Sequence, residues 1–184
     1  MIEIKCIETA GFASALQALH LPYGKECQSK AEANSWDITT KSDILSTYGE
    51  WNITLSEHDK KLIKALIKNG DEHAKVLRGI VVYLEINAPR YWWVEFDTYR
   101  IGREQLASES TMHMQGKGMS EEQLLWMKSH LTEGTMQKRV QMLSYQTLRR
   151  IYLQRHNHRL PEWREFCNWI IKNLHYSWMI YEQE

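Results

Sequence analysis

The residues best suited to chemistry lie in one stretch, Asn87 to His113. It combines five aromatic side chains and three arginines with a polar tail that ends in hydroxyl groups and a histidine, Ser108, Ser110, Thr111 and His113. Arginine makes bidentate contacts with phosphate, hydroxyl groups add neutral donors, and aromatic faces stack on other rings. The stretch therefore favours a phosphate-bearing planar ligand. A competing interpretation is a tryptophan-rich core helix followed by a polar loop, because aromatic residues at helical spacing are usually core.

A second candidate is Arg155. It follows Ile151 by four positions and Leu148 by seven, so it extends the apolar, inward stripe of its predicted helix. An inward arginine needs an anionic partner. A ligand phosphate would serve, and so would a carboxylate such as Glu162, which would make a buried ion pair. The sequence leaves both interpretations open.

Several common site types are excluded. The sequence contains no Walker loop, no G-x-G-x-x-G and no H-E-x-x-H motif. His156 and His158 form an H-x-H pair, but alternate positions on a helix point about 200° apart, and no third ligand has suitable spacing. The three cysteines show no C-x-x-C spacing, which argues against a zinc site and a disulfide framework. We therefore expect no metal site and a reducing compartment.

Composition limits the partners and the location. Lys plus Arg and Asp plus Glu both number 23 in 184 residues, so the formal net charge gives no case for nucleic acid or an anionic membrane as partner. No apolar run approaches the length of a membrane span, and the first residues lack the pattern of a signal peptide. We expect a cytoplasmic protein whose partner is a small molecule.

The pattern of the chain predicts one mixed α/β (α+β) domain over residues 1–184. Alternation predicts a strand at residues 2–7 and a β-branched run predicts a buried strand at 80–86. The stretch 23–52 is polar and aperiodic and is predicted to be a long loop within the domain. Helices are predicted over residues 13–21, from Ser56 to Asn69-Gly70, from Ser120 to about 131, and over 135–154 and 161–181.

Two segments in this order resemble the flavin-dependent thymidylate synthase family. Residues 60–89, KKLIKALIKNGDEHAKVLRGIVVYLEINAP, resemble the family's helix, strand and alanine-proline that precede its motif helix. Residues 145–163, YQTLRRIYLQRHNHRLPEW, resemble its late helix with leucine-arginine pairs and a nucleotide-binding arginine. The resemblance covers most of the chain apart from residues 23–52. It implies a central sheet flanked by helices, and a homotetramer whose sites lie between subunits.

The family's signature residues are largely replaced. With Ala88-Pro89 aligned on the family's alanine-proline, its arginine-histidine-arginine signature falls on Thr98, Tyr99 and Arg100, and its flavin-contacting histidine falls on Gly79. Without a gap the family's catalytic serine falls on Ser108. A three-residue insertion instead matches its asparagine-glutamate-x-serine-x-arginine to residues 108–113, and we prefer this alignment because it retains an acid and a hydroxyl.

The resemblance implies roles for these residues in nucleotide binding. Ser108 or Thr111 would activate the base and Glu109 would orient it. Phosphate would be held by residues drawn from Arg100, Arg155, Arg159, Ser110 and His113. FAD is the implied cofactor, with most of the family's flavin contacts replaced; Tyr99, Trp92 and His73 are the candidates to contact it.

Three functions follow from these assignments. The first is flavin-dependent one-carbon transfer, a methylation, to the base of a deoxyuridine monophosphate, with folate use left open. The second is a non-catalytic protein of the same fold that sequesters or senses a nucleotide and has lost the flavin site. The third is a structural or interaction protein whose aromatic residues are core.

Overall fold

Strand β4 (Val81–Pro89) occupies an inner position in the sheet of the computed structural model, which describes residues 1–24, 30–32, 52–114 and 116–182. The four-stranded sheet has the order β1-β4-β6-β5, and every neighbouring pair is antiparallel. The other strands are β1 (Glu3–Ala10), β5 (Arg103–Ser108) and β6 (Met136–Ser144). The predicted strands at 2–7 and 80–86 are therefore present, each with slightly different ends.

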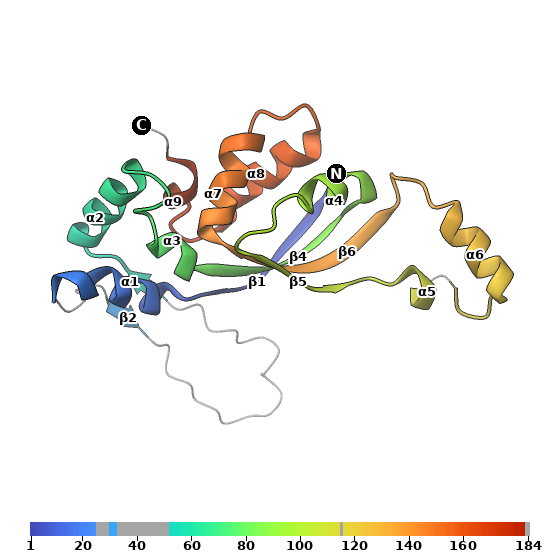
Figure 1. Cartoon of the computed structure of the whole chain (residues 1–184), viewed down its shortest axis with the longest axis horizontal. Helices are drawn as coiled ribbons and strands as arrows, with labels where there is room; N and C mark the ends of the chain where they lie inside the picture. The colour runs from blue at the N-terminus through green and yellow to red at the C-terminus, as the bar shows by residue number, and fades with distance from the viewer. Residues whose placement is uncertain (25–29, 33–51, 115, 183–184) are drawn as a thin grey trace, which may run out of the picture.

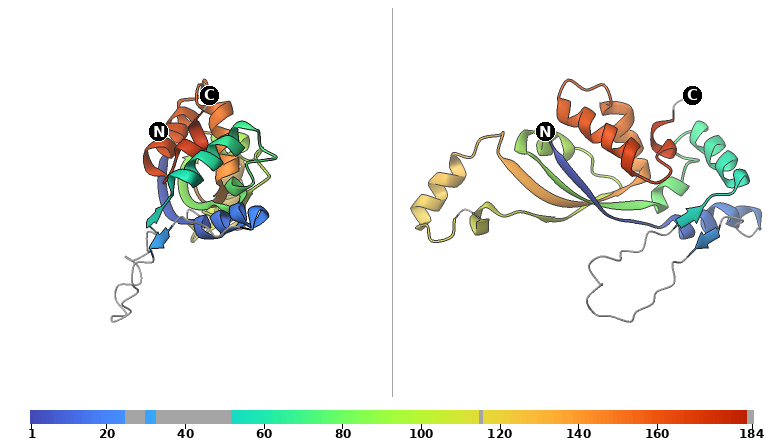
Figure 2. Two further views of the ribbon diagram at one scale, coloured as in Figure 1. Left: turned by 90° about the vertical axis from the view of Figure 1, so that its left-hand side faces the viewer. Right: turned by 180° about the vertical axis from the view of Figure 1, so that it is seen from behind.

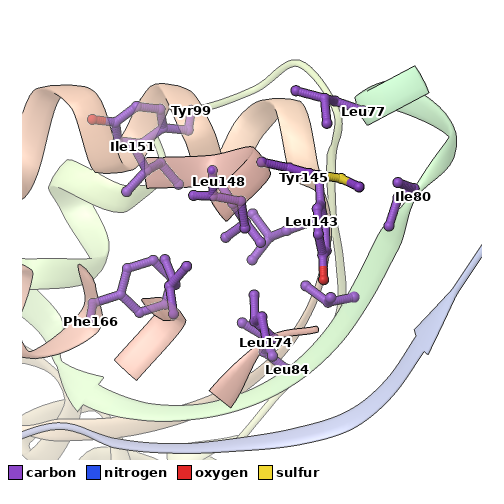
Figure 3. Packing of buried hydrophobic residues seen from close by; sticks show 14 of the residues in the cluster. Leu77, Ile80, Leu84, Tyr99, Leu143, Tyr145, Leu148, Ile151, Phe166 and Leu174 are labelled. Atoms are coloured by element: carbon purple, nitrogen blue, oxygen red, sulfur yellow. The ribbon is translucent and has the colours of Figure 1, made fainter. Parts of the chain in front are cut away.

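Two helices cover one face of this sheet, as Figures 1 and 2 show. They are α7 (Tyr145–Arg155) and α8 (Pro161–Asn173). Alternate residues of β4 are fully buried on the covered face, and their neighbours on the other face are half-buried. Figure 3 shows Leu84 and Leu143 of the sheet packing near Leu148 of α7 and Phe166 of α8. Burial of these apolar side chains is the main force that holds the helices on the sheet.

The remaining elements lie at the ends of this two-layer body or cross it. The N-terminal half contributes α1 (Phe12–His20), the 3-10 helix η1 (Leu21–Tyr23), β2 (Lys30–Glu32), β3 (Asn52–Thr54), α2 (Glu57–Lys68) and α3 (Val76–Gly79). Helix α9 (Trp178–Tyr181) follows α8. The predicted cap at Ser56 is confirmed, because its side chain accepts a hydrogen bond from the backbone N–H of Asp59.

The aromatic stretch forms a buried helix, α4 (Arg90–Phe96). Trp92, Trp93 and Phe96 are all 0% exposed. The rings of Trp92 and Phe96 pack against Trp163 and Phe166 of α8, and the Trp93 ring packs against the other two. The prediction of a core helix is confirmed for these rings. The segment after this helix is not a loop, however, because residues 103–108 pair with β6 as an edge strand.

Two predicted helices are wrong in part. Residues 136–144, predicted to begin a helix at 135, form β6, which pairs with β4 on one side and β5 on the other. Helix α7 begins only after Ser144, whose side chain caps it by accepting from the N–H of Thr147. Strand pairing on both edges outweighs the helix propensity of this polar segment. The predicted helix 161–181 is interrupted, because Tyr176 adopts a positive φ of 49° between α8 and α9.

Two short helices stand away from the body (Figure 1). They are α5 (Thr111–Met114), after β5, and α6 (Glu121–Ser129), before β6. The predicted capping box at Ser120 and Gln123 is present. Helix α6 buries none of its side chains within the chain, and Leu125 and Trp126 are exposed. The end of the β5 and β6 pair therefore carries apolar surface that this chain does not cover.

Most of the predicted loop at residues 23–52 lies outside the described residues. Its described parts include β2, which pairs with β3 in a separate two-stranded sheet. Within the described residues, none of the helices has both the length and the apolar character that crossing a membrane requires.

Candidate functional site

A β-bulge in β5 turns Ser108 toward the helix-covered face of the sheet. Gln105 is the register partner of Gln141, but the register shifts before Ala107, and Ser108 becomes the partner of Arg139. Directly opposed residues of antiparallel strands point to the same face. Arg139 is in turn the partner of Ile86, a core residue of β4, so Ser108 and Arg139 both point to the core side. Ser108 and Arg139 are thus opposite each other in the register at the outer part of this face, and the Arg139 guanidinium extends to Asp97 and Gln105.

One carboxylate holds two arginines on the same face. Asp97, just after α4, accepts from Nη1 of Arg103 at 2.8 Å and from Nη1 of Arg139 at 3.0 Å. The Arg139 guanidinium also lies 4.5 Å from the centroid of the Trp93 ring, a cation–π contact. Both arginine side chains are mostly buried, at 13% and 15% exposed. Two positive charges against one negative charge leave this trio suited to an anion.

Two glutamines extend this polar surface inward. Nη1 of Arg139 donates to Oε1 of Gln105 at 3.1 Å, and Nε2 of Gln141 donates to the same oxygen at 3.3 Å. Gln141 is fully buried, and its Oε1 has no hydrogen-bond partner among the described residues. A buried acceptor without a partner is costly and is more common at binding sites than elsewhere. The face therefore offers both donors and an unused acceptor.

A third arginine, Arg155 of α7, is neutralised by a carboxylate of α4. Nη1 of Arg155 donates to Oε2 of Glu95 at 2.9 Å, and its Nε donates to the Tyr99 hydroxyl at 2.9 Å. The same Glu95 oxygen accepts from Nε1 of Trp163, whose ring centroid lies 4.8 Å from the Arg155 guanidinium. Arg155 thus has the carboxylate partner expected of an inward arginine, one charge against one. It is held in place without a ligand.

The carboxylate that pairs with Arg155 is not the one named from sequence. Glu162 instead accepts from the hydroxyl of Tyr91 at 2.5 Å. This hydrogen bond, with a smaller contribution from burial, raises the pKa of Tyr91 to about 12. Arg155 pairs with Glu95 because helix α4 packs beside α7. The spacing of residues within α7 carries no information about this packing.

Most of the remaining candidates are exposed. The candidates at the outer end of β5 and in α5 follow one another in the chain. Ser108, Glu109 and His113 are exposed, and Ser110 and Thr111 are half-buried. Glu109 is tied to β6, because its N–H donates to the carbonyl of Lys138 at 2.8 Å and its carboxylate accepts from the N–H of Lys138 at 3.4 Å.

The arginine candidates lie elsewhere. Arg100, in the turn before β5, and Arg159, between α7 and α8, are exposed. Neither side chain makes a hydrogen bond or ion pair with the part of the chain that the structure describes. A strand rises about 3.4 Å per residue, so Ser108 lies roughly 17 Å along β5 from Arg103 and farther from Arg100. Within a single chain, the hydroxyl candidates therefore lie far from the arginine candidates.

The three cofactor candidates differ in access. His73 is exposed, in the turn between α2 and α3. The Trp92 ring is enclosed by the aromatic core, and Tyr99 is 8% exposed with its hydroxyl bonded to Gln154 and Arg155. Within one chain, neither ring offers a free face for stacking.

The sequence reasoning did not identify Arg139, Asp97, Gln105 and Gln141 as site residues. The sequence predicts residues 136–144 as part of a helix, and a helix would scatter alternate residues to different faces. The signal for Arg139 and Gln141 is period-two alternation in MQKRVQMLS, which places Arg139, Gln141 and Leu143 on one face of a strand.

Comparisons with known proteins identify the fold. No family model matches this chain, and no curated protein matches it significantly in sequence. A crystal structure of thymidylate synthase X from Helicobacter pylori with FAD and dUMP aligns over 97% of this chain and 97% of its own, with a TM-score of 0.67 and 12% identity. A second structure, flavin-dependent thymidylate synthase from the same organism complexed with FAD and dUMP, gives 0.66 and 14% over 97% and 98%. The expected fold, a central sheet flanked by helices, is confirmed.

Proposed function

We propose that this chain is a nucleotide-binding protein that takes a pyrimidine deoxynucleoside monophosphate such as dUMP. The observation that carries the proposal is the pair Arg103 and Arg139 sharing one carboxylate, Asp97, on the face of the sheet to which Ser108 also points. The trio has one positive charge in excess, and it lies on the covered face of a fold whose solved examples were crystallised with dUMP. A phosphate supplies the missing negative charge, and arginine binds it in bidentate fashion.

The residues expected from sequence take part around this centre. Ser108 adds a hydroxyl donor on the same face, opposite Arg139 in the strand register, and Glu109, Ser110, Thr111 and His113 supply polar groups at the outer end of β5. Arg100 is exposed and without a side-chain partner in the described ranges, so it can pair with a phosphate at no cost to the fold. Arg159 shares this property. Arg155 is assigned a supporting part, since Glu95 already neutralises it.

The residues named for flavin do not fit ring stacking within one chain. A stacked isoalloxazine needs an exposed aromatic face, and the rings of Trp92 and Tyr99 are buried. Of the three candidates only His73 is accessible. The nucleotide phosphate is therefore the ligand group that the described residues fit.

A second candidate function is flavin-dependent one-carbon transfer to the base of dUMP. It is favoured by the solved structures of the same fold, which contain FAD as well as dUMP. In this function Ser108 or Thr111 would polarise the base and Glu109 would orient it, because all three lie at one end of β5. If the flavin site has been lost, the same fold would bind the nucleotide without catalysis, which is the function proposed first.

We propose that the site forms between copies of this chain. Arg100 and Ser108 stand at opposite ends of β5, and the apolar side chains of Leu125 and Trp126 are exposed on α6. A second copy that covers α6 would bury this apolar surface and could bring the arginine end of one chain to the hydroxyl end of the other. The resemblance described above implies four copies.

The experiment is titration of dUMP into purified protein by calorimetry, with 2′-deoxyuridine as the matched ligand that lacks phosphate. The wild-type protein should bind dUMP and bind deoxyuridine much more weakly. Arg139→Gln should lower dUMP affinity at least about tenfold, because a hydrogen bond to a charged group contributes roughly 1.5 to 3 kcal/mol. Arg150→Gln, on an exposed arginine of α7, is the control and should bind as wild type.

Two results would overturn the proposal. One is the absence of dUMP binding by folded wild-type protein, and the other is equal affinity for dUMP and deoxyuridine. The absorption spectrum of the purified protein separates the two candidate functions. A flavin spectrum with turnover of dUMP supports one-carbon transfer, and a colourless protein that binds dUMP and ignores added FAD supports nucleotide binding alone.

A further inference from the structure

Three side chains that can bind a metal meet where α1 approaches α2. His20 is the last residue of α1, and His58 and Asp59 are in the first turn of α2. Their ligand atoms all lie within 4.8 Å of one another. In the sequence His20 is separated from the other two by nearly forty positions, so no spacing rule pointed to it. This group lies at the opposite end of the molecule from α5 and α6 (Figure 1).

The group has a buried base and one open side. His20 and Asp59 are buried, and Nε2 of His20 lies 2.6 Å from Oδ1 of Asp59. Nδ1 of His58 lies 3.5 Å from the same oxygen, and its side chain is 58% exposed. The two imidazole rings are nearly parallel, with centroids 5.9 Å apart. Two ligands are thus fixed in the interior and the third lies at the surface, where an ion can enter.

The N-cap of α2 fixes the backbone position of Asp59. The backbone N–H of Asp59 donates to Oγ of Ser56, the N-cap of α2, at 3.1 Å. A carboxylate in the first turn of a helix also interacts favourably with the helix dipole. Because this residue is already fixed, little conformational freedom is lost when a cation binds.

The donor set selects the class of metal. Two imidazole nitrogens and one carboxylate oxygen suit zinc and the neighbouring divalent transition metals rather than Mg²⁺ or Ca²⁺, which prefer oxygen ligands. In tetrahedral zinc sites the ligands lie about 2.0 to 2.2 Å from the metal, which places them about 3.3 Å apart. The 3.5 Å separation of His58 and Asp59 already matches this. The 2.6 Å separation of His20 and Asp59 is a hydrogen-bond length, and it would open by about 0.7 Å.

We propose that His20, His58 and Asp59 form a binding site for a divalent transition metal of the zinc type. Three protein ligands leave a fourth position for water on the exposed side of His58. The bound ion joins the end of α1 to the start of α2 and so closes the part of the chain between them. Closing a long segment stabilises the folded state. This site is independent of the nucleotide function proposed above.

The test uses the full chain, stripped with a chelator, then incubated with Zn²⁺ alone and desalted. Wild-type protein should retain one zinc per chain by elemental analysis. Its melting temperature should rise by about 5 to 10 °C at a free zinc concentration one hundred times the dissociation constant. His58→Gln removes an exposed ligand without disturbing the buried pair, and should lower zinc affinity at least about tenfold.

The matched control is His130→Gln, which removes an exposed histidine at the far end of the chain, on the C-cap of α6. It should bind zinc as wild type does. Because cysteines and isolated histidines also take up zinc, the comparison between the two variants carries the result. Equal zinc affinity in the wild type and in His58→Gln would overturn the proposal, as would failure of the wild type to retain zinc. The nucleotide titration is unaffected by either outcome.

Discussion

Ser108 lies opposite Arg139 in the register of β5 and β6, and both side chains point to the helix-covered face of the sheet. The bulge between Gln105 and Ala107 creates this relationship. Without it, strict alternation would place Ser108 on the opposite face from Arg103 and Gln105. A single extra residue in an edge strand therefore decides whether the Ser108 hydroxyl points to the same face of the sheet as Arg103 and Arg139.

Replacing Ser108 by Ala should weaken dUMP binding and leave stability unchanged. The hydroxyl is exposed and has no partner in the described part of the chain, so its removal costs the fold nothing. One lost neutral hydrogen bond of about 1 kcal/mol corresponds to roughly fivefold in affinity, measured by calorimetry. Ser14→Ala, on an exposed serine of α1, is the control. Unchanged dUMP affinity in Ser108→Ala would remove this residue from the site.

Arg155→Gln should mainly lower stability. It breaks the ion pair with Glu95 and the hydrogen bond to Tyr99. Because both partners of the ion pair are partly exposed, we expect a loss of about 1 to 2 kcal/mol in the free energy of unfolding, measured by urea denaturation. A double-mutant cycle with Glu95→Gln isolates the pair. If Arg155→Gln instead reduces dUMP affinity more than Arg139→Gln does, Arg155 is the phosphate ligand.

Gly102→Ala should destabilise the protein by about 2 to 3 kcal/mol. Gly102 has a φ of +71°, and a Cβ there would lie 2.5 Å from Oγ1 of Thr147 and 2.6 Å from Oγ of Ser144. These two side chains cap α7 and bond the turn before β5. Gly118→Ala is the matched control, since its φ is +85° but its Cβ would meet nothing within 4 Å. Backbone strain alone should cost about 1 kcal/mol there, and equal losses in both variants would contradict the packing explanation.

Stability should fall at high pH partly through Cys167. Burial raises the pKa of this thiol to about 12, from an ordinary value of 9.0. The unfolded chain therefore loses its proton first, and stability decreases as pH rises from about 9 toward 12. Between pH 7.5 and 10.5 the wild type should lose about 2 kcal/mol more than Cys167→Ala, measured by urea denaturation at each pH. Parallel losses in the two proteins would show that the thiol does not contribute.

Leu125→Glu combined with Trp126→Ala should disrupt self-association. Both side chains are exposed on α6, which buries no residue within the chain. The double variant should elute as a smaller species in size-exclusion chromatography with light scattering, and should keep the helical content of the wild type. Leu21 is also exposed, in η1, so Leu21→Gln is a control for loss of surface apolarity. A wild-type protein that is monomeric would contradict the proposed assembly.

The sequence by itself determined the elements whose signals are local. The caps at Ser56 and Ser120, the buried run of β4 and the aromatic helix α4 all depend on residues within a few positions of one another. The order of these elements was also sufficient to indicate the family fold. A resemblance with few identical residues can still indicate the fold, because packing constrains the order of helices and strands more than it constrains the identity of each residue.

Only the tertiary structure decided which charged groups meet. Residues 136–144 became β6 because strands on both sides supply hydrogen-bond partners, and that pairing placed Arg139 beside Ser108. At the end of α4, Asp97 pairs with two arginines and Glu95 pairs with a third. The spacing of these residues in the sequence does not predict either pairing. His20 reaches Asp59 for the same reason. Contacts between distant segments depend on strand register and helix packing, and these are set by the whole core rather than by local pattern.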